Sequence, residues 1–308
     1  MLLFMAFEGV YSILPTAFTD SGDLDKSSQR RVVDLFIEKG ANGLTALGVT
    51  GEVARLEEHE RANVLEIVVD QAAGRVPIIA GTSAAGTRTC ISYTRQAKAI
   101  GASAVMVSPP RMPKLNSAAV VNHYKALADA VDLPIIVQDY PPIAGFAMEP
   151  ALLARIAKEI PSARTIKLED PPTPFKTARI LEASAGTTVQ IFGGLGGVFL
   201  LEELISGATG AMTGFAFPEI LARIMKHWNA GARDAAADVF YRAVPLMRFE
   251  FQEGIGMAIR KEVLRRRGAL ASAATRAPAG ALDGPTTQAL DRVLTWVTTQ
   301  KGMEWISV

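Results

Sequence analysis

A regular alternation of short apolar runs and longer amphipathic runs is the feature that most constrains this fold. It recurs at intervals of roughly thirty residues as far as Asn229, a spacing typical of β/α units. Each apolar run lacks strict alternation, which is typical of parallel strands buried on both faces. Eight such units predict a TIM barrel, the (β/α)8 fold. The expected strands are the runs at 10–14, 44–49, 76–80, 104–107, 135–138, 165–167, 189–192 and 210–212.

Helical spacing fills the intervals between these runs, and glycine or proline closes most of them. The expected helices are the segments 24–39, 57–73, 87–100, 116–131, 150–160, 174–184, 198–206 and 218–229. The main alternative is a doubly wound open sheet, which carries a glycine-rich dinucleotide-binding turn after its first strand. The chain reads LPTAF at that point, so the barrel is favoured.

The alternation stops after residue 230, where only helices are expected. These helices lie at 232–247, 253–267 and 286–299, with a linker rich in alanine, proline and glycine at 273–284. The 308 residues, 49% of them apolar, suffice for one large domain or for a barrel with an appendage. We therefore predict a catalytic barrel domain at 1–229 and a C-terminal helical extension at 230–308.

The charge pattern favours a small-molecule partner over a polymer or a membrane. The net charge is +1 with both signs interspersed, so neither a nucleic acid nor an anionic membrane is indicated. The basic run Arg265–Arg267 is short, and we expect it to be a solvated helix end. The apolar start MLLFMAF has no basic n-region and no cleavage site, and it is too short for a signal peptide or a membrane span.

Cysteine and histidine usage argues against a metal site. The single cysteine, Cys90, allows no disulfide and no cysteine cluster within the chain, which suits a reducing cytosol and a cytoplasmic location. Cys90 lies in a helical pattern and is interpreted as a core residue. The three histidines, His59, His123 and His227, are far apart and are expected on polar helix faces. No metal is therefore predicted.

Lys167 is the most informative single residue. It lies in an apolar run, TIKL, that an acidic pair and two prolines end at once, so it is expected near the C-terminal end of the sixth strand. That end of a barrel strand carries the active site. An apolar pocket lowers the pKa of a lysine from about 10.4, and the neutral amine forms a Schiff base with a 2-oxo acid. The alternatives are a lysine that snorkels to solvent or one that forms an ion pair with Glu169, two residues on and roughly 7 Å away.

Three loops that follow other strands hold further candidates. After the second strand, Thr50 and Gly51 offer a hydroxyl and backbone N–H groups to a carboxylate, or else form an ordinary turn. After the fifth strand, Gln138 is a candidate site residue and Tyr140 a candidate proton shuttle, or else the prolines simply hold this loop. After the seventh strand, GGLGG does not match a nucleotide-binding loop, so close approach of a small substrate at Gly194 is favoured.

These motifs together resemble the dihydrodipicolinate synthase / N-acetylneuraminate lyase family. The resemblance runs over about residues 9–265 and is carried by LPTAFTDSGDLD, GVTGE, VPIIAGT, VQDYPPIAG, TIKLED and GATGAMTG. It implies a (β/α)8 barrel with a helical C-terminal extension, commonly assembled as a tetramer from two tight dimers. It also implies a class I lyase that holds pyruvate or another 2-oxo acid as a Schiff base, with no metal and no separate cofactor.

By position, the resemblance makes Lys167 the Schiff-base lysine. It makes Val49, Thr50 and Gly51 the turn that binds the substrate carboxylate. Met212, within GATGAMTG, is a further predicted substrate-binding residue.

Departures from the family pattern argue against a true synthase. The family's strand-five tyrosine is here Gln138, and the first threonine of its strand-two turn is Val49. The tyrosine that a synthase lends to its dimer partner falls near Arg111, and its semialdehyde-binding arginine falls on Ile143. The relay of a synthase is therefore missing.

The VQD, K-x-E and GATGAMTG motifs are instead similar to those of 2-keto-3-deoxy sugar-acid dehydratases, among them L-2-keto-3-deoxyarabonate dehydratase. We therefore predict a dehydratase or aldolase, with Glu169 transferring protons because Gln138 does not titrate. The alternatives are a 4-hydroxy-tetrahydrodipicolinate synthase and a non-catalytic paralogue that binds a 2-oxo acid.

Overall fold

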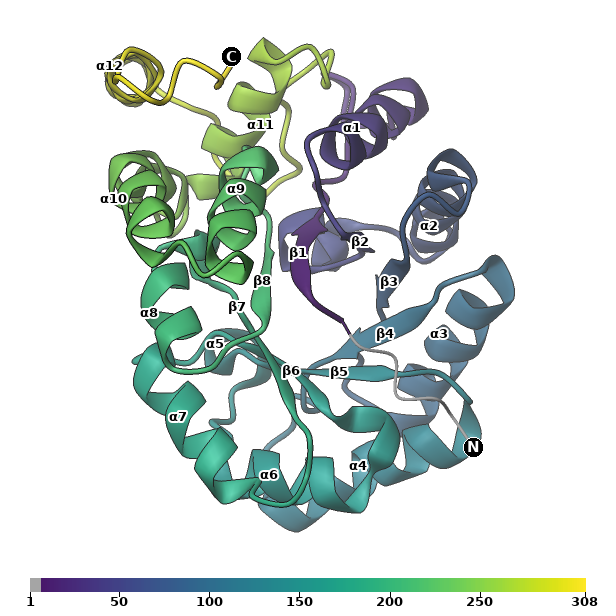
Figure 1. The fold of residues 1–308 in the computed structure, drawn as a ribbon. Helices are drawn as coiled ribbons and strands as arrows, with labels where there is room; N and C mark the ends of the chain where they lie inside the picture. Colours follow the sequence, from purple (N-terminus) through teal and green to yellow (C-terminus); the bar gives the residue numbers. More distant parts are fainter. Residues whose placement is uncertain (1–6) are drawn as a thin grey trace. The chain divides into compact units, whose positions relative to one another are not determined.

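The computed structural model describes residues 7–308, so most of the apolar start MLLFMAF lies outside the described residues. Within this range, eight parallel strands form a closed barrel in the order β1 to β8, which confirms the predicted (β/α)8 fold (Figure 1). The strands are β1 (Gly9–Ile13), β2 (Gly43–Ala46), β3 (Ile78–Gly81), β4 (Ala104–Val107), β5 (Ile135–Asp139), β6 (Thr165–Leu168), β7 (Gln190–Gly193) and β8 (Gly210–Thr213).

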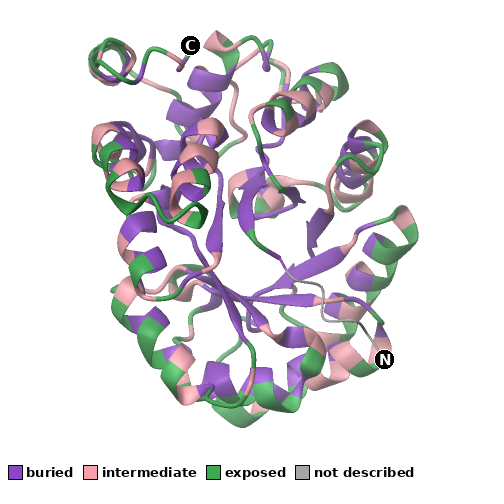
Figure 2. Ribbon diagram, viewed as in Figure 1, coloured by how far each residue is buried: buried purple, intermediate pink, exposed green. Residues whose placement is uncertain are grey.

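Burial explains the sequence pattern of these strands. Every residue of all eight strands is buried, whereas the helices carry exposed residues on one side only (Figure 2). A parallel strand covered on both faces has no polar face, so its sequence shows a continuous apolar run. A polar or charged residue in such a run therefore marks a position that needs a buried partner.

The chain forms two compact units, of which the first holds β3 to β7 and β8 as far as Met212. The first unit comprises residues 7–9, 77–194 and 199–212. Its helices are α3 (Thr87–Ile100), α4 (Ser117–Ala130), α5 (Pro141–Ala144), α6 (Pro150–Glu159), α7 (Thr173–Ala183) and α8 (Leu200–Ile205), with a 3-10 turn at Pro161–Ala163. Asn116 begins α4 by accepting from the backbone N–H of Ala119, as expected of an N-cap asparagine.

The second unit comprises residues 10–76, 195–198 and 213–308. Its helices are α1 (Lys26–Glu38), α2 (Glu58–Ala72), α9 (Pro218–Asn229), α10 (Arg233–Glu250), α11 (Gly256–Arg266) and α12 (Gly284–Thr298), with 3-10 turns at Val49–Gly51, Val53–Arg55 and Leu195–Gly197. Asp25 caps α1, and Glu57 and Glu60 form a capping box on α2. The predicted domain boundary after residue 229 stays a prediction, and α9 ends at Asn229.

The structure differs from the predicted elements after β2 and β5. The run at 44–49 ends early, because Leu47 has a left-handed φ of 59° and Val49–Gly51 forms a 3-10 turn. The segment after β5, expected as a loop, contains the short helix α5 with Pro141 at its first position. Proline fits there because the first helical residue has no intrahelical N–H bond to make.

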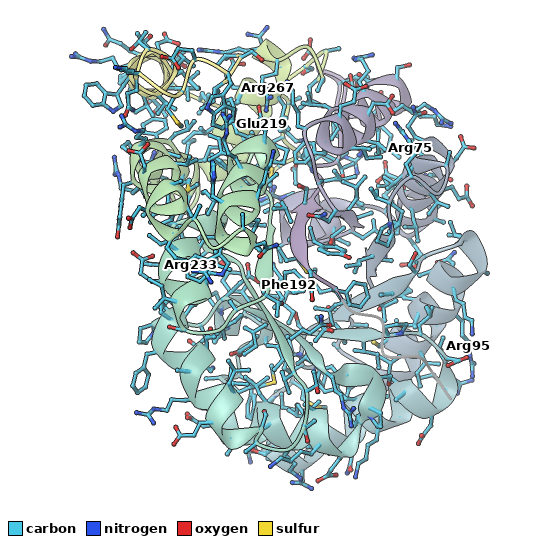
Figure 3. The ribbon with its side chains drawn as sticks, in the orientation of Figure 1. Arg75, Arg95, Phe192, Glu219, Arg233 and Arg267 are labelled. Atoms are coloured by element: carbon cyan, nitrogen blue, oxygen red, sulfur yellow. The ribbon has the colours of Figure 1, made fainter. Side chains whose placement is uncertain are left out.

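Two expectations about single residues were wrong. His123 was expected on a polar helix face, but it is buried in α4, where its Nδ1 lies 2.9 Å from Thr87 Oγ1. Arg267 was expected in solvent, but its side chain is only 2% exposed. Its Nη2 lies 2.5 Å from Glu219 Oε1, and Figure 3 labels both residues. By contrast, Cys90 is fully buried, which confirms its interpretation as a core residue.

Candidate active site

Lys167 is a buried residue of β6 and is 2% exposed. Its Cα pairs with that of Gln138 in β5 and with that of Phe192 in β7; Figure 3 labels Phe192. The predicted alternative of a lysine that snorkels to solvent is therefore wrong. A buried ammonium is costly without a partner, so the groups around Nζ determine what this lysine can do.

Glu169 is the carboxylate partner of Lys167. Lys167 Nζ donates to Glu169 Oε2 at 2.6 Å, and the two side chains are only 3% and 12% exposed. The predicted ion pair is therefore present, and it places a proton acceptor in direct contact with the amine. This arrangement suits an amine that must lose its proton before it attacks a carbonyl.

Gln138 completes a hydrogen-bond chain across neighbouring strands. Its Nε2 donates to Glu169 Oε2 at 2.8 Å, and its Oε1 accepts from Ser108 Oγ at 3.0 Å. The backbone N–H of Ser108 in turn donates to Ser83 Oγ at 2.9 Å. These hydrogen bonds thus link residues at the C-terminal ends of β3, β4, β5 and β6. The active site of a (β/α)8 barrel lies at this end of the strands.

Ser108 is a site residue that the sequence reasoning missed. It directly follows β4, so its position after a barrel strand was the available signal. Serine is common in loops, and only the register of β4 against β5 brings its hydroxyl to Gln138. With Ser108 and Glu169 bound to opposite ends of one amide, the orientation of Gln138 is fixed.

Gly194 provides the space that Glu169 occupies. A Cβ added at this glycine would lie 2.3 Å from Glu169 Cγ, which is far inside van der Waals contact. The backbone N–H of Gly194 also donates to the Leu168 carbonyl oxygen at 3.1 Å. The absence of a side chain at Gly194 therefore leaves room for the Glu169 carboxylate. The predicted contact of Gly194 with a substrate stays a prediction.

A second buried carboxyl, that of Glu203 in α8, lies behind Gly193. A Cβ at Gly193 would lie 1.6 Å from Glu203 Oε2, and Thr173 Oγ1 donates to Glu203 Oε1 at 2.6 Å. The pKa of Glu203 is raised to about 8, mainly by burial and to a smaller extent by the charges of Glu202 and Glu169, whereas the hydrogen bond from Thr173 lowers it. Sequence reasoning missed Glu203, because a glutamate in a short helix is usually solvated.

The predicted carboxylate-binding turn lies in the second unit. Val49 is 38% exposed, and Gly51 is held by a 2.6 Å hydrogen bond from Thr16 Oγ1 to its carbonyl oxygen. The hydroxyl oxygen of Thr50 is buried and has no hydrogen-bond partner among the residues described. An unpartnered buried hydroxyl is costly, so Thr50 Oγ1 is suited to bind a ligand.

The glutamate that ends the GVTGE motif serves the structure of the second unit. Glu52 has a left-handed φ of 54° and is buried. It forms an ion pair with Lys261 of α11, pairs with Arg55 at 2.9 Å, and accepts from the backbone N–H of Arg276 at 3.0 Å. The sequence reasoning missed this role, because two of the three partners, Lys261 and Arg276, come from the distant C-terminal part of the chain.

Tyr140 and Met212 complete the predicted site residues. Tyr140 directly precedes α5 and is partly buried, and Met212 is fully buried in β8. Their predicted roles, proton transfer or substrate binding for Tyr140 and substrate binding for Met212, stay predictions.

The closed barrel places the chain in the (β/α)8 class, and the buried Lys167–Glu169 pair at the C-terminal end of a strand is its candidate active site. The chain belongs to the dihydrodipicolinate synthetase family, whose model matches residues 6–296. Members of this family are lyases and synthases, and this chain is accordingly an enzyme of that kind.

Individual relatives agree with this assignment. The chain is 33% identical over 276 residues to an L-2-keto-3-deoxyarabonate dehydratase of Azospirillum brasilense, covering 88% of each chain. It is 32% identical over 232 residues to a 4-hydroxy-tetrahydrodipicolinate synthase of Pelobacter propionicus, covering 75% of this chain and 78% of the relative. The crystal structure of dihydrodipicolinate synthase from Rhodopseudomonas palustris has a TM-score of 0.88 and 33% identity, covering 94% of this chain and 97% of that one.

Among residues 7–308, the structure contains no helix that is both long and apolar enough to cross a membrane.

Proposed function

We propose that the protein is a class I lyase that forms a Schiff base through Lys167 and dehydrates or cleaves a 2-keto-3-deoxy sugar acid. The observation that carries the proposal is the 2.6 Å contact between Lys167 Nζ and Glu169 Oε2 at a buried strand end. The similarity to the Azospirillum dehydratase, 33% over 276 residues, supports this substrate class.

The proposed reaction begins with proton transfer from the Lys167 ammonium to Glu169. The neutral amine attacks C2 of the substrate, and a proton passes from its nitrogen to the C2 oxygen, which gives a carbinolamine. Glu169 then returns its proton to the C2 hydroxyl, which leaves as water while the nitrogen lone pair forms the iminium. The resulting iminium acidifies C3. Glu169 then removes a C3 proton, giving an enamine, and protonates the C4 hydroxyl as it leaves. In the aldolase variant of this reaction, Glu169 instead removes the proton of the C4 hydroxyl. C4 then becomes a carbonyl as the C3–C4 bond breaks, and the electron pair of that bond forms the enamine.

Gln138 and Ser108 hold the proton carrier in place during these steps. The amide of Gln138 does not titrate, so it serves as a fixed donor to the carboxylate that shuttles the proton. Ser108 binds the other end of the amide at 3.0 Å and prevents it from turning over. The iminium is itself the electron sink, so the proposed chemistry uses neither a metal nor a separate cofactor.

We assign the substrate carboxylate to the turn after β2. This assignment follows the family resemblance, by which Val49, Thr50 and Gly51 bind the substrate carboxylate. The unpartnered hydroxyl of Thr50 supports this assignment. By the family resemblance we also propose a homo-oligomer, either a tetramer or a dimer. The single cysteine favours a cytoplasmic location.

A second candidate is 4-hydroxy-tetrahydrodipicolinate synthase, the name of several relatives at about this level of identity. The observation against it is Gln138, a residue without a titratable group at the position of the family's relay tyrosine. A third candidate, a paralogue that binds a 2-oxo acid without turnover, is disfavoured because Lys167 and Glu169 are both present and in contact.

Borohydride trapping tests the Schiff base directly. Pyruvate, and then a panel of 2-keto-3-deoxy acids, is added with borohydride, and peptide mass spectrometry locates any adduct. We expect a reduced adduct on Lys167 and none in the Lys167→Met variant, which keeps the apolar stem. No adduct with any of these acids, or an adduct only on another lysine, contradicts the proposal. Turnover across the same panel then separates the three candidates.

A further inference from the structure

A second group of charges joins β5 and the end of β6 through helix α7. Lys176 Nζ donates to Asp139 Oδ2 at 2.6 Å and to Asp170 Oδ2 at 2.7 Å. Asp139 is the last residue of β5, Asp170 lies in the loop between β6 and α7, and Lys176 lies in the first turns of α7. One ammonium therefore links three consecutive parts of the first unit.

Asp139, Asp170 and Lys176 lie on the opposite face of the strand ends from the candidate active site. Asp139 is the chain neighbour of Gln138, and Asp170 is the chain neighbour of Glu169. Successive side chains of a strand point to opposite faces of a sheet. Gln138 and Glu169 meet on one face at 2.8 Å, and Asp139 and Asp170 meet Lys176 on the face that α7 covers.

The backbone shows why the two faces are coupled. The N–H of Glu169 donates to the carbonyl oxygen of Asp139 at 2.9 Å, so the strand ladder continues one residue beyond β6. Any displacement of Asp139 relative to Asp170 therefore moves Glu169 relative to Gln138. The interaction on the α7 side sets the geometry on the active-site side.

Burial makes this interaction strong and specific. The side chain of Asp139 is 0% exposed, that of Lys176 is 9% exposed and that of Asp170 is 28% exposed. In such surroundings two carboxylates repel each other strongly unless a cation lies between them. Lys176 thus offsets the repulsion between the two carboxylates and links their chain segments in addition to the strand ladder.

We propose that Lys176 is a positioning residue of the active site, which clamps the ends of β5 and β6 so that Gln138, Glu169 and Lys167 keep their hydrogen-bonded geometry. This inference rests on the proposed Schiff-base function. Lys176 contacts neither the substrate nor the reacting amine in this scheme. It acts through the backbone that carries Gln138 and Glu169.

The test measures pyruvate trapping on Lys167 as a function of pyruvate concentration, which gives a limiting rate and a half-saturating concentration. We expect Lys176→Met to lower the limiting rate by about 10- to 100-fold, the size of effect that a small misplacement of catalytic groups produces. We expect the half-saturating concentration to change by less than about threefold, because the clamp does not bind the substrate. Lys176→Arg keeps the positive charge and offers a fork of N–H donors for two carboxylates, so it should restore most of the rate.

A matched control is Lys125→Met, which removes another intramolecular lysine pair, that of Lys125 with Glu159 on the half-exposed face of α4 and α6. It should leave both trapping parameters unchanged. A folded Lys176→Met variant with a limiting rate within about threefold of the parent overturns the proposal, since misplacement predicts a larger loss. If Lys176→Met does not fold, the Asp170→Asn variant tests the proposal instead. It removes the Lys176–Asp170 ion pair and leaves the buried Lys176–Asp139 pair. A limiting rate that Asp170→Asn leaves unchanged overturns the clamp.

A structural readout separates this proposal from the proposed function. If the parent protein forms no adduct with pyruvate or with any of the 2-keto-3-deoxy acids, the Schiff-base function fails, whatever Lys176 does. Crystal structures of the parent and of Lys176→Met then test the clamp alone. Separation of Gln138 Nε2 from Glu169 Oε2 beyond hydrogen-bonding distance in the variant supports it, and an unchanged contact overturns it.

Discussion

Lys167 Nζ and Glu169 Oε2 lie 2.6 Å apart, and the two residues are separated by one residue of the same chain. Close pairing of this kind gives the amine a hydrogen-bond acceptor, although Gln138 stands where the family pattern has the strand-five tyrosine. The carboxylate also accepts from Gln138, so it is held rather than free to rotate. The carboxylate that contacts Lys167 is thus supplied by the residue that directly follows its own strand.

The first prediction concerns proton transfer by Glu169. Glu169→Gln keeps the shape of the side chain but removes its basicity, so turnover of a 2-keto-3-deoxy acid should fall by about 10²–10⁴-fold. Steady-state kinetics with the best substrate of the panel measures the loss. Tyr140→Phe is the comparison variant and should have a much smaller effect. Unchanged turnover in Glu169→Gln transfers the role to Tyr140 or to water.

Some parts of this site were readable from the sequence for a physical reason. The short apolar run followed by two prolines singles out Lys167, because a charged residue at a strand end is rarely buried without a partner or a functional role. Glu169 followed from the two-residue period of a strand. The eight β/α units likewise followed from hydrophobic periodicity, which depends on burial and not on details of packing.

Other parts were not readable, because they depend on which segments meet. Glu203 lies in LLEELI, where a glutamate ordinarily faces solvent, and its burial follows only from the packing of α8 against Gly193. The hydroxyl of Ser108 reaches Gln138 only through strand register. The strand before the GVTGE turn was predicted too long, because the left-handed φ of Leu47 opposes the intrinsic preference of leucine.

The second prediction concerns the residue that the sequence reasoning missed. Ser108→Ala removes the hydrogen bond to Gln138 Oε1 and leaves that buried oxygen without its donor. We expect a loss of about 1–3 kcal/mol in the free energy of unfolding, the usual penalty for a buried polar group left unpaired. The catalytic rate constant should also fall, because the amide that holds Glu169 is then free to turn over. Urea unfolding and steady-state kinetics measure the two effects. Wild-type values in both show that Ser108 does not hold Gln138.

The third prediction uses the space beside Glu169. Gly194→Ala places a Cβ 2.3 Å from Glu169 Cγ, so the carboxylate must leave its position next to Lys167. We expect borohydride trapping of pyruvate on Lys167 to slow by at least about tenfold, as misplacement of a catalytic group predicts. Gly280→Ala is the matched control, since a Cβ there meets nothing within 4 Å. Normal trapping by a folded Gly194→Ala variant shows that the contact with Glu169 is dispensable.

The fourth prediction concerns Glu203 and the pH dependence of stability. Burial raises its folded-state pKa from 4.5 to about 8, so between these values the folded protein binds a proton that the unfolded chain has released. The free energy of unfolding therefore falls as pH rises through this window, by at most about 1.4 kcal/mol per pH unit, and this group adds no further change above the folded-state pKa. Asp139 and Glu250, with pKa values raised to about 6, act in the same direction at lower pH, and His123, with its pKa lowered to about 4 from 6.5, acts in the opposite direction there.

The interval from about pH 6.5 to 8 consequently isolates Glu203. Glu203→Gln mimics the protonated form, so its unfolding free energy should stay level across this interval while that of the parent protein declines. Urea denaturation at several pH values measures both curves, and Glu253→Gln, which alters an exposed glutamate, should follow the parent. Parallel curves for the parent and Glu203→Gln place the ionisation of Glu203 outside this interval. In that case Glu203 is already charged at pH 6.5, and its hydrogen bond from Thr173, not its proton, keeps it buried behind Gly193.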